Sequence, residues 1–410
     1  MTQLPRYQLR APASFLRLFR DDHVPQHLSL DDIGTVEMWA LAGLAALARR
    51  NGEPALEVAN SRTSEAGRFA SAVGFEDVVA GLPSTTLGEA GRTIKLQRIR
   101  DIQEVERVAR RIVDLMLPAS EEDETRSTLL YVLVELMRNA VQHSRDPKGG
   151  VVAAQLMKAG YAGYPRAVIQ VAVADAGVGV LEALRASHPE LESPSAALVF
   201  ALRPHISGTF TKGRTGSAYN AGMGLFFISE MTKLTQGRLL LASRGAALSL
   251  RGHEDGYAGA HIEEVAPTGS GFPGTLVAFE IPLGEVHDHA GLIEVIASKA
   301  RERAPSRDLA PWMRFEKPPE GVSSFVVHPV AEDISGAARL AATIEGHLVR
   351  REPVALDFRG MKVCTQSFLH ALLFTGVRLS WAVQVPIYVE NVAPGVAAGL
   401  RLVDNYARGG

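Results

Sequence analysis

The stretch Glu135-Leu-Met-Arg-Asn-Ala-Val-Gln-His143 forms the last turns of a helix that the sequence predicts from about residue 124 to residue 143. Its polar residues Glu135, Asn139 and His143 are spaced four apart, so an α-helix places them on one face, while leucine and alanine side chains line another. Magnesium bound with a nucleotide needs only one or two protein oxygens, and the Asn139 amide can supply one. Glu135 is placed to orient or deprotonate an attacking water or hydroxyl group. A solvated helix face would show the same spacing, so other segments have to decide.

Two glycine-containing segments occur at the ends of predicted strands. Asp175-Ala-Gly177-Val-Gly179 follows an apolar strand predicted over residues 168–173. The Asp175 carboxylate could accept a hydrogen bond from an adenine amino group, and the two glycines permit close backbone approach to a flat ring. Gly274-Thr275 opens a strand predicted over residues 275–282, where the threonine hydroxyl could support Asp175. Taken singly, each segment is also consistent with a plain glycine turn.

A third segment, Gly222-Met223-Gly224-Leu225, immediately precedes a helix predicted over residues 225–235. The free N–H groups and the dipole of a helix start favour phosphate, so this loop could cradle a triphosphate. Upstream, residues 208–216 are polar and glycine-rich and carry Lys212 and Arg214, as a lid over phosphates would require. A flexible loop with ordinary surface charges is the alternative for Lys212 and Arg214.

In this order the segments resemble the motifs of the histidine-kinase-type (GHKL, or Bergerat-fold) ATPases, a superfamily that includes DNA gyrase B, the gyrase-like heat-shock chaperones and the bacterial anti-sigma-factor serine kinases. Residues 135–143 resemble the N box, residues 175–179 and 222–225 the two glycine boxes, and residues 274–275 the closing motif. The resemblance implies an α/β fold in which residues 91–285 form an ATP-binding domain, with a mixed sheet covered by helices on one face. It also implies ATP and Mg²⁺ as cofactors.

By the same resemblance, Glu135 would serve the attacking group, and Asn139 would bind both the metal and the nucleotide. The remaining nucleotide-binding residues would be His143, Asp175, Gly177, Gly179, Lys212, Arg214, Gly222, Met223, Gly224, Leu225 and Thr275. Histidine kinases carry a phosphoacceptor histidine on a helix upstream, and no His-Glu or His-Asp pair on a predicted helix precedes this N box. The serine-kinase branch, whose N box also ends in histidine, is therefore the nearer resemblance.

Both flanks are predicted to be small α/β domains. Residues 323–410 resemble an anti-sigma-antagonist (STAS-like) domain, in which Ser367 occupies a place comparable to a phosphorylated serine, although a plain helix cap is the alternative. Residues 1–90 show the same rhythm more faintly. Residues 286–322 are predicted to be a linker that carries one helix, and the glycine-rich insertion 251–272 a mobile surface loop.

Composition limits the class of protein. Hydrophobic residues make up 46% of the 410 residues and charged ones 21%, and a net charge of -2 gives no basic surface for nucleic acid. The single cysteine, Cys364, excludes an internal disulfide, and no apolar run is long enough to cross a bilayer, so we expect a cytoplasmic protein. The expected partners are an adenine nucleotide and another protein or the flanking domains, with a homodimer possible. Three functions stay open: an ATP-hydrolysing switch, a nucleotide-dependent binding module that barely turns over, and a protein serine kinase.

Overall fold

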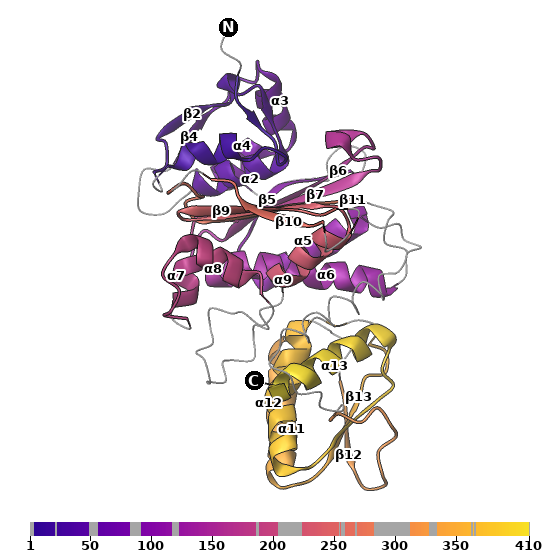
Figure 1. The fold of residues 1–410 in the computed structure, drawn as a ribbon. Helices are drawn as coiled ribbons and strands as arrows, with labels where there is room; N and C mark the ends of the chain where they lie inside the picture. The colour runs from indigo at the N-terminus through magenta and orange to yellow at the C-terminus, as the bar shows by residue number, and fades with distance from the viewer. Residues whose placement is uncertain are drawn as a thin grey trace. The chain divides into compact units, whose positions relative to one another are not determined.

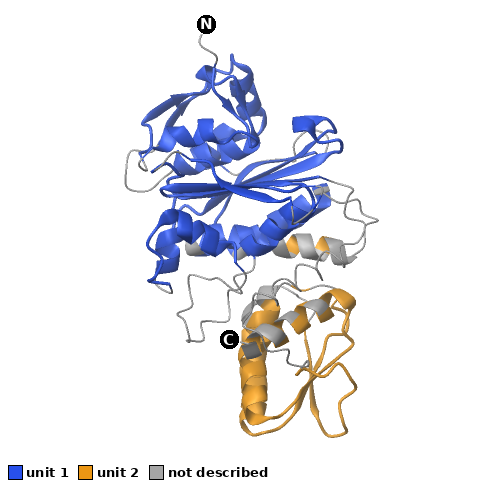
Figure 2. Ribbon diagram, viewed as in Figure 1, with its two compact units in different colours: residues 1–119, 132–208, 223–287 blue, residues 120–131, 209–222, 288–410 orange. Residues whose placement is uncertain are grey.

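The computed structural model describes residues 4–20, 23–48, 56–82, 92–116, 123–185, 188–203, 224–253, 255, 259–266, 269–282, 312–327, 334–361, 364 and 366–409. The chain divides into two compact units, residues 1–119, 132–208 and 223–287 in the first and residues 120–131, 209–222 and 288–410 in the second (Figure 2). Both units combine helices with sheets, so the predicted α/β class is confirmed. Among the described helices, none combines the length and the apolar composition that a bilayer crossing requires.

A seven-stranded sheet forms the centre of the first unit. Across the sheet its strands are β10 (His261–Glu264), β9 (Ala246–Arg251), β8 (Arg238–Ser243), β11 (Thr275–Pro282), β7 (Val168–Asp175), β6 (Gly150–Met157) and β5 (Thr93–Ile99). Every pairing between these neighbours is antiparallel, so the sheet is not the mixed sheet that the resemblance implied. In three of these pairs, β6–β7, β8–β9 and β9–β10, the neighbours are consecutive along the chain and joined by a short connection, and such strands pair antiparallel without a crossover helix.

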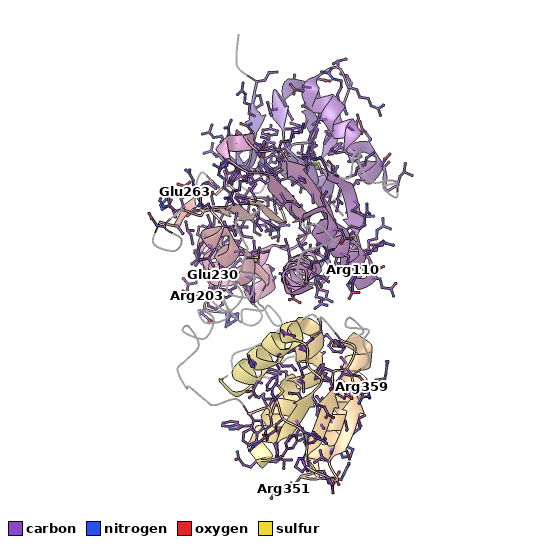
Figure 3. The ribbon with its side chains drawn as sticks, turned by 90° about the vertical axis from the view of Figure 1, so that its right-hand side faces the viewer. Arg110, Arg203, Glu230, Glu263, Arg351 and Arg359 are labelled. Carbon is purple, nitrogen blue, oxygen red and sulfur yellow. The ribbon has the colours of Figure 1, made fainter. Side chains whose placement is uncertain are left out.

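Helices cover one face of this sheet (Figure 1). They are α5 (Ile102–Met116), α6 (Asp123–Arg138) and α9 (Gly224–Leu234), with α7 (Val180–Arg185) and α8 (Pro194–Ala201) beside β8 and β9. Figure 3 shows Arg110 on α5 and Glu230 on α9 at this side of the sheet. Helix α5 is amphipathic and buries Val105, Val108 and Ile112 toward the sheet.

The opposite face is covered by the N-terminal segment, which was expected to be a separate domain. Its helix α2 (Met38–Leu47) packs against β6 and β7, and all of its residues are buried. One hydrophobic core joins α2 to sheet residues such as Ala172 and Ala174. A helix that is apolar on all sides has to be buried on all sides, which explains why both faces of the sheet are covered. Residues 1–82 and the sheet therefore share one core.

The rest of the N-terminal segment is built from short elements. They are β1 (Arg6–Tyr7), α1 (Ala13–Leu16), the 3₁₀ turns Arg17–Phe19 and Leu30–Asp32, β2 (His27–Ser29), β3 (Thr35–Val36), β4 (Glu57–Ala59), α3 (Glu65–Ala72) and α4 (Phe75–Ala80). Strand β1 pairs with β3 and β2 with β4, both parallel. The Ser64 hydroxyl accepts from the Gly67 N–H at 2.9 Å and caps the N-terminus of α3.

A buried network of hydrogen bonds joins the N-terminal segment to strands β7 and β11 of the sheet. Glu37 precedes α2, and its Oε2 accepts from the backbone N–H of Leu9 (2.9 Å), the Trp39 indole (3.1 Å) and the Gln170 amide (3.0 Å). The same Gln170 nitrogen donates to Glu280 at 2.9 Å, so one amide joins two buried carboxylates. The donors compensate for the desolvation of Glu37 and link the two halves of the unit.

The insertion 251–272 is not only a surface loop. Its residues 261–264 form strand β10, which pairs with β9 at the edge of the sheet. Phe272 is fully buried and packs edge-to-face on Phe19 with ring centroids 5.5 Å apart. The glycines of the insertion suggested mobility, but the large aromatic side chain at its end has a place in the core, which fixes this part of the segment.

The second unit contains a three-stranded sheet of β12 (Ser323–Val326), β13 (Val354–Asp357) and β14 (Ile387–Glu390), paired parallel. Helices α11 (Ile334–Val349), α12 (Gln366–Val383) and α13 (Pro394–Gly409) alternate with the strands, and β13 is wholly buried. The end of the predicted linker also belongs here. Met313 lies in this core, and the Arg314 N–H donates to Ile387 at 2.9 Å. The other residues of the linker up to 311 lie outside the described residues.

Candidate functional site

The predicted site residues on strands meet at one end of the central sheet. Asp175 is the last residue of β7 and is in register with Thr275, the first residue of β11. Thr275 is in register with Ser243 at the end of β8 on its other side. Ala174 faces α2, and side chains alternate along a strand. Asp175 therefore lies on the opposite face of the sheet, which α5, α6 and α9 cover. The antiparallel register therefore brings together two predicted residues that are far apart in the sequence.

Close backbone packing at Gly177 and Gly274 explains why these positions are glycine. A β-carbon on Gly177 would lie 2.0 Å from the carbonyl oxygen of Ser144, just after the N box. A β-carbon on Gly274 would lie 2.0 Å from the carbonyl oxygen of Asp175. Neither distance leaves room for any side chain. The two glycines thus hold the Asp175 loop against the N-box segment on one side and the closing strand on the other.

Residues 135–143, which resemble an N box, do not form one continuous α-helix. Helix α6 ends at Arg138, and residues Asn139–His143 continue as a π-helix that contacts β7. Its wider i→i+5 turn means that Asn139 and His143 are not one α-turn apart, so the expectation of three residues on one α-helical face has to be corrected. Asn139 is half-buried. The side chain of His143 lies outside the described residues. Single π-helical turns occur frequently at functional sites.

Glu135 is engaged in a buried ion pair. Its carboxylate lies 3.1 Å from the guanidinium of Arg138, one turn later, and the side chains are only 4% and 1% exposed. Gly224, which begins α9, packs directly on this residue, and a β-carbon there would lie 2.8 Å from the Glu135 β-carbon. The start of the second glycine-box helix therefore contacts the N box at Glu135. A buried arginine partner for Glu135 was not predicted.

Two residues after the N box connect it to the first glycine box. The carbonyl oxygen of Ser144 accepts from the Val178 N–H at 2.9 Å, and Asp146 Oδ2 accepts from the Ala176 N–H at 3.1 Å. The Ser144 hydroxyl in turn donates to the Ala140 carbonyl at 2.6 Å, back into the π-helix. Sequence reasoning missed both residues. The Ser-Arg-Asp-Pro run signals only a turn, and its long-range partners are not visible in it.

The Asp175 carboxylate is buried, which raises its pKa to about 7. Backbone N–H groups of Gly177 and Thr275 oppose this rise by hydrogen bonding, and the positive charge of Arg244 opposes it too, whereas the negative charge of Asp146 adds to it. The hydrogen bond from Gly177 is 2.9 Å long. A carboxylate with so high a pKa is a candidate functional group, because burial without full pairing costs stability that a purely structural residue would avoid.

The turn after β8 closes the site from the other side. Ser243 Oγ donates to the Gly274 carbonyl at 2.7 Å and accepts from the Val180 N–H at 3.0 Å. The next residue, Arg244, donates to the Gly177 carbonyl at 2.9 Å. Ser243 and Arg244 were also missed, since a Ser-Arg-Gly turn carries no signal of which loop it will meet.

The remaining predicted residues fall into two groups. The Leu225 side chain packs beside the small core of α7 and α8, so only its backbone N–H at the helix start is available to a phosphate. Gly179 has a φ of +82° and ends the loop before α7. Lys212, Arg214, Gly222 and Met223 lie outside the described residues.

No protein-family model matches the chain, and no curated protein sequence matches it.

Proposed function

We propose that this chain binds Mg²⁺-ATP at the end of β7 and uses the nucleotide as a regulatory switch. The observation that carries the proposal is the convergence of the motif segments: Gly177 against Ser144 beyond the N box, Gly274 against Asp175, and Gly224 against Glu135. Glycine spaced for turns alone would not require these mutual contacts. The first two contacts flank the buried Asp175 carboxylate, as a nucleotide site at the end of β7 would require.

The donor set fits this ligand. The half-buried Asn139 offers an amide oxygen, which suits a magnesium ion whose other ligands are phosphate oxygens and water. Asp175, when ionised, accepts a hydrogen bond from the adenine amino group. The N-terminus of α9, an eleven-residue helix, would present its first-turn N–H groups to the phosphates. When bound, the metal supplies positive charge that neutralises the phosphate oxygens.

The Glu135–Arg138 pair favours slow turnover. A carboxylate that accepts a charge-assisted hydrogen bond has one oxygen already occupied, which leaves less capacity to take a proton from water. We therefore assign Glu135 the role of orienting the attacking group. This favours a nucleotide-dependent partner-switching module with slow hydrolysis over a rapid ATPase. Serine kinase activity stays the alternative, with Ser367 at the second position of α12 as one candidate acceptor.

The switch would act on another protein or on the flanking segments of the same chain, in the cytoplasm, without nucleic acid as a ligand. A partner that prefers one nucleotide state is sufficient for regulation, because binding then shifts the population toward that state.

The test is equilibrium binding of ATP with and without magnesium, combined with γ-labelled ATP to follow free phosphate and protein-bound label. Asn139→Ala is expected to abolish the magnesium-dependent part of binding. Gln142→Ala, an exposed residue of the same π-helix, is the matched control and is expected to bind like the parent. Magnesium-dependent binding that survives in Asn139→Ala removes the metal assignment, and a parent chain that binds no ATP removes the function.

Label that accumulates on the protein would identify a kinase, whereas free phosphate without labelled protein would identify an ATPase switch. Binding with neither product would identify the non-hydrolysing module. The three functions are thus separated by one incubation.

A further inference from the structure

Arg244 lies in the β8–β9 turn. Among the described residues, it is the arginine that hydrogen-bonds to residues 175–179, the segment that resembles the first glycine box. Arg244 donates to the carbonyl oxygen of Gly177 through Nη2 at 2.9 Å and through Nε at 3.3 Å. Two donors of one planar guanidinium on the same oxygen fix the orientation of that peptide group. The contact joins a turn and a loop that lie 67 residues apart in the sequence.

The stem of Arg244 lies along the same loop. A β-carbon on Gly179 would lie 3.1 Å from Arg244 Cδ and 3.2 Å from its Cγ. The aliphatic part therefore covers Gly179 while the guanidinium reaches Gly177. Ser243, the preceding residue, holds the end of the loop through Val180. Together the two residues span the loop that begins at Asp175.

We propose that Arg244 is a positioning residue for adenine recognition: it holds the Asp175–Gly179 loop in its binding conformation and supplies the positive charge that keeps Asp175 ready to accept a hydrogen bond. This inference rests on the proposed function. Arg244 acts through Gly177 and through its charge, and it is not assigned a contact with the nucleotide. It would therefore determine base selectivity and its pH dependence rather than phosphate binding.

The electrostatic part follows from the groups that face Asp175. Among the described residues, the charged side chains that act on Asp175 are Asp146 with a negative charge and Arg244 with a positive one, beside the backbone N–H groups of Gly177 and Thr275. Loss of the Arg244 charge leaves the repulsion from Asp146 unopposed, which makes the ionised form of Asp175 less favourable. Nucleotide binding that needs the ionised form would then require a higher pH.

The experiment compares the full-length parent with Arg244→Gln, which keeps one donor but no charge, and Arg244→Lys, which keeps the charge. Arg251→Gln, an exposed arginine at the far end of the same hairpin, is the control. ATP and GTP affinities are measured between pH 6 and pH 8.5, and circular dichroism checks the fold. We expect Arg244→Gln to weaken ATP about 10-fold, to reduce the ATP preference over GTP, and to move the midpoint of the pH profile up by about half a unit.

Arg244→Lys is expected to retain the parent midpoint with affinity between the parent and Arg244→Gln, and Arg251→Gln to match the parent throughout. An Arg244→Gln protein with parental ATP affinity and midpoint overturns the inference and leaves the nucleotide site standing. A parent chain that binds no ATP overturns the proposed function and this inference with it. If Arg244→Gln does not fold, Arg244→Lys decides, because a midpoint shifted away from that of the parent contradicts the role of the charge.

Discussion

The two ends of the β7–β11 pair hold buried carboxylates in opposite circumstances. At one end Asp175 is paired with Thr275, on the face that α5, α6 and α9 cover. At the other end Gln170 is paired with Glu280, on the face that α2 covers. There Glu37 accepts three hydrogen bonds on one oxygen, two from the N-terminal segment and one from Gln170. Within the described part of the chain, Asp175 accepts hydrogen bonds from the backbone N–H groups of Gly177 and Thr275.

This difference separates a structural carboxylate from a candidate functional one. A carboxylate offers about four lone-pair sites, so Asp175 keeps acceptor capacity beyond the two backbone donors that the described residues supply. The donors around Glu37 come from both halves of the unit, and they would be left without a partner if it were removed. We expect substitutions at the two ends to change stability in opposite directions.

The largest expected effect is at the structural end. Glu37→Ala removes the acceptor of the Leu9 N–H, the Trp39 indole N–H and one Gln170 amide N–H. Because these buried donors then lack that hydrogen bond, the free energy of unfolding should fall by about 3–5 kcal/mol. Urea denaturation measures the change. Glu57→Ala, an exposed glutamate of the same segment, should stay within about 0.5 kcal/mol of the parent. A Glu37→Ala loss below about 1 kcal/mol would show that the network does not hold the N-terminal segment.

A substitution of Asp175 is expected to raise the free energy of unfolding rather than lower it. Asp175→Asn removes a buried charge whose pKa is raised to about 7, so the nucleotide-free protein should gain on the order of 1–3 kcal/mol at pH 8. The same change should weaken ATP binding about 100-fold, because the amide no longer accepts the adenine hydrogen bond in the same way. Denaturation and nucleotide binding on one preparation check both. A loss of stability at pH 8 would place Asp175 with Glu37 as a structural residue.

A smaller effect on ATP affinity is expected for a substitution of Glu135, which lies on α6. Glu135→Gln keeps an acceptor for Arg138 but cannot carry the negative charge, so ATP affinity should change by less than about 3-fold while any hydrolysis falls about 100-fold. Steady-state phosphate release and equilibrium binding separate the two. Unchanged hydrolysis would clear Glu135 of any part in turnover.

The smallest effect is the pH dependence itself. The folded-state pKa of Asp175 is raised from 3.8 to about 7, so its contribution to stability is present at acid pH and is lost as pH rises through 7. ATP affinity should move the other way and rise with pH between 6 and 8, because the ionised carboxylate binds adenine. Titration of the phosphates falls in the same range, so Asp175→Asn serves as the baseline. An identical profile in this variant would exclude Asp175 as the titrating group.

The sequence predicted the elements whose signals are local. Strand β11 agrees with its predicted limits, and α9 agrees with its predicted limits within one residue at each end. Thr275 was predicted to support Asp175 from its place at the start of the last strand, and the two residues are in register on β11 and β7. Strands β6 and β9 and helices α7, α8 and α13 were not predicted, because their apolar runs do not differ enough from their surroundings.

What could not be predicted depends on contacts between distant segments. The π-helix at Asn139 arises where the helix end meets the loop after β7, and nothing in the pattern of residues 135–143 marks the change of turn. The roles of Asp146 and Arg244 are set by backbone groups of another segment, which no side-chain pattern encodes. The burial of α2 was open to prediction in principle, since a helix that is apolar throughout needs cover on every side.

Helix α2 also has a consequence for how the chain is made. It leaves the ribosome about 100 residues before β6 and β7, the strands that cover it. At the usual pace of translation this interval lasts roughly 5–20 s. For that time an apolar helix has no sheet to pack on, which is the condition under which nascent chains recruit chaperones. Production of residues 91–285 alone would reverse the problem, leaving the alanine-lined face of the finished sheet without its helix.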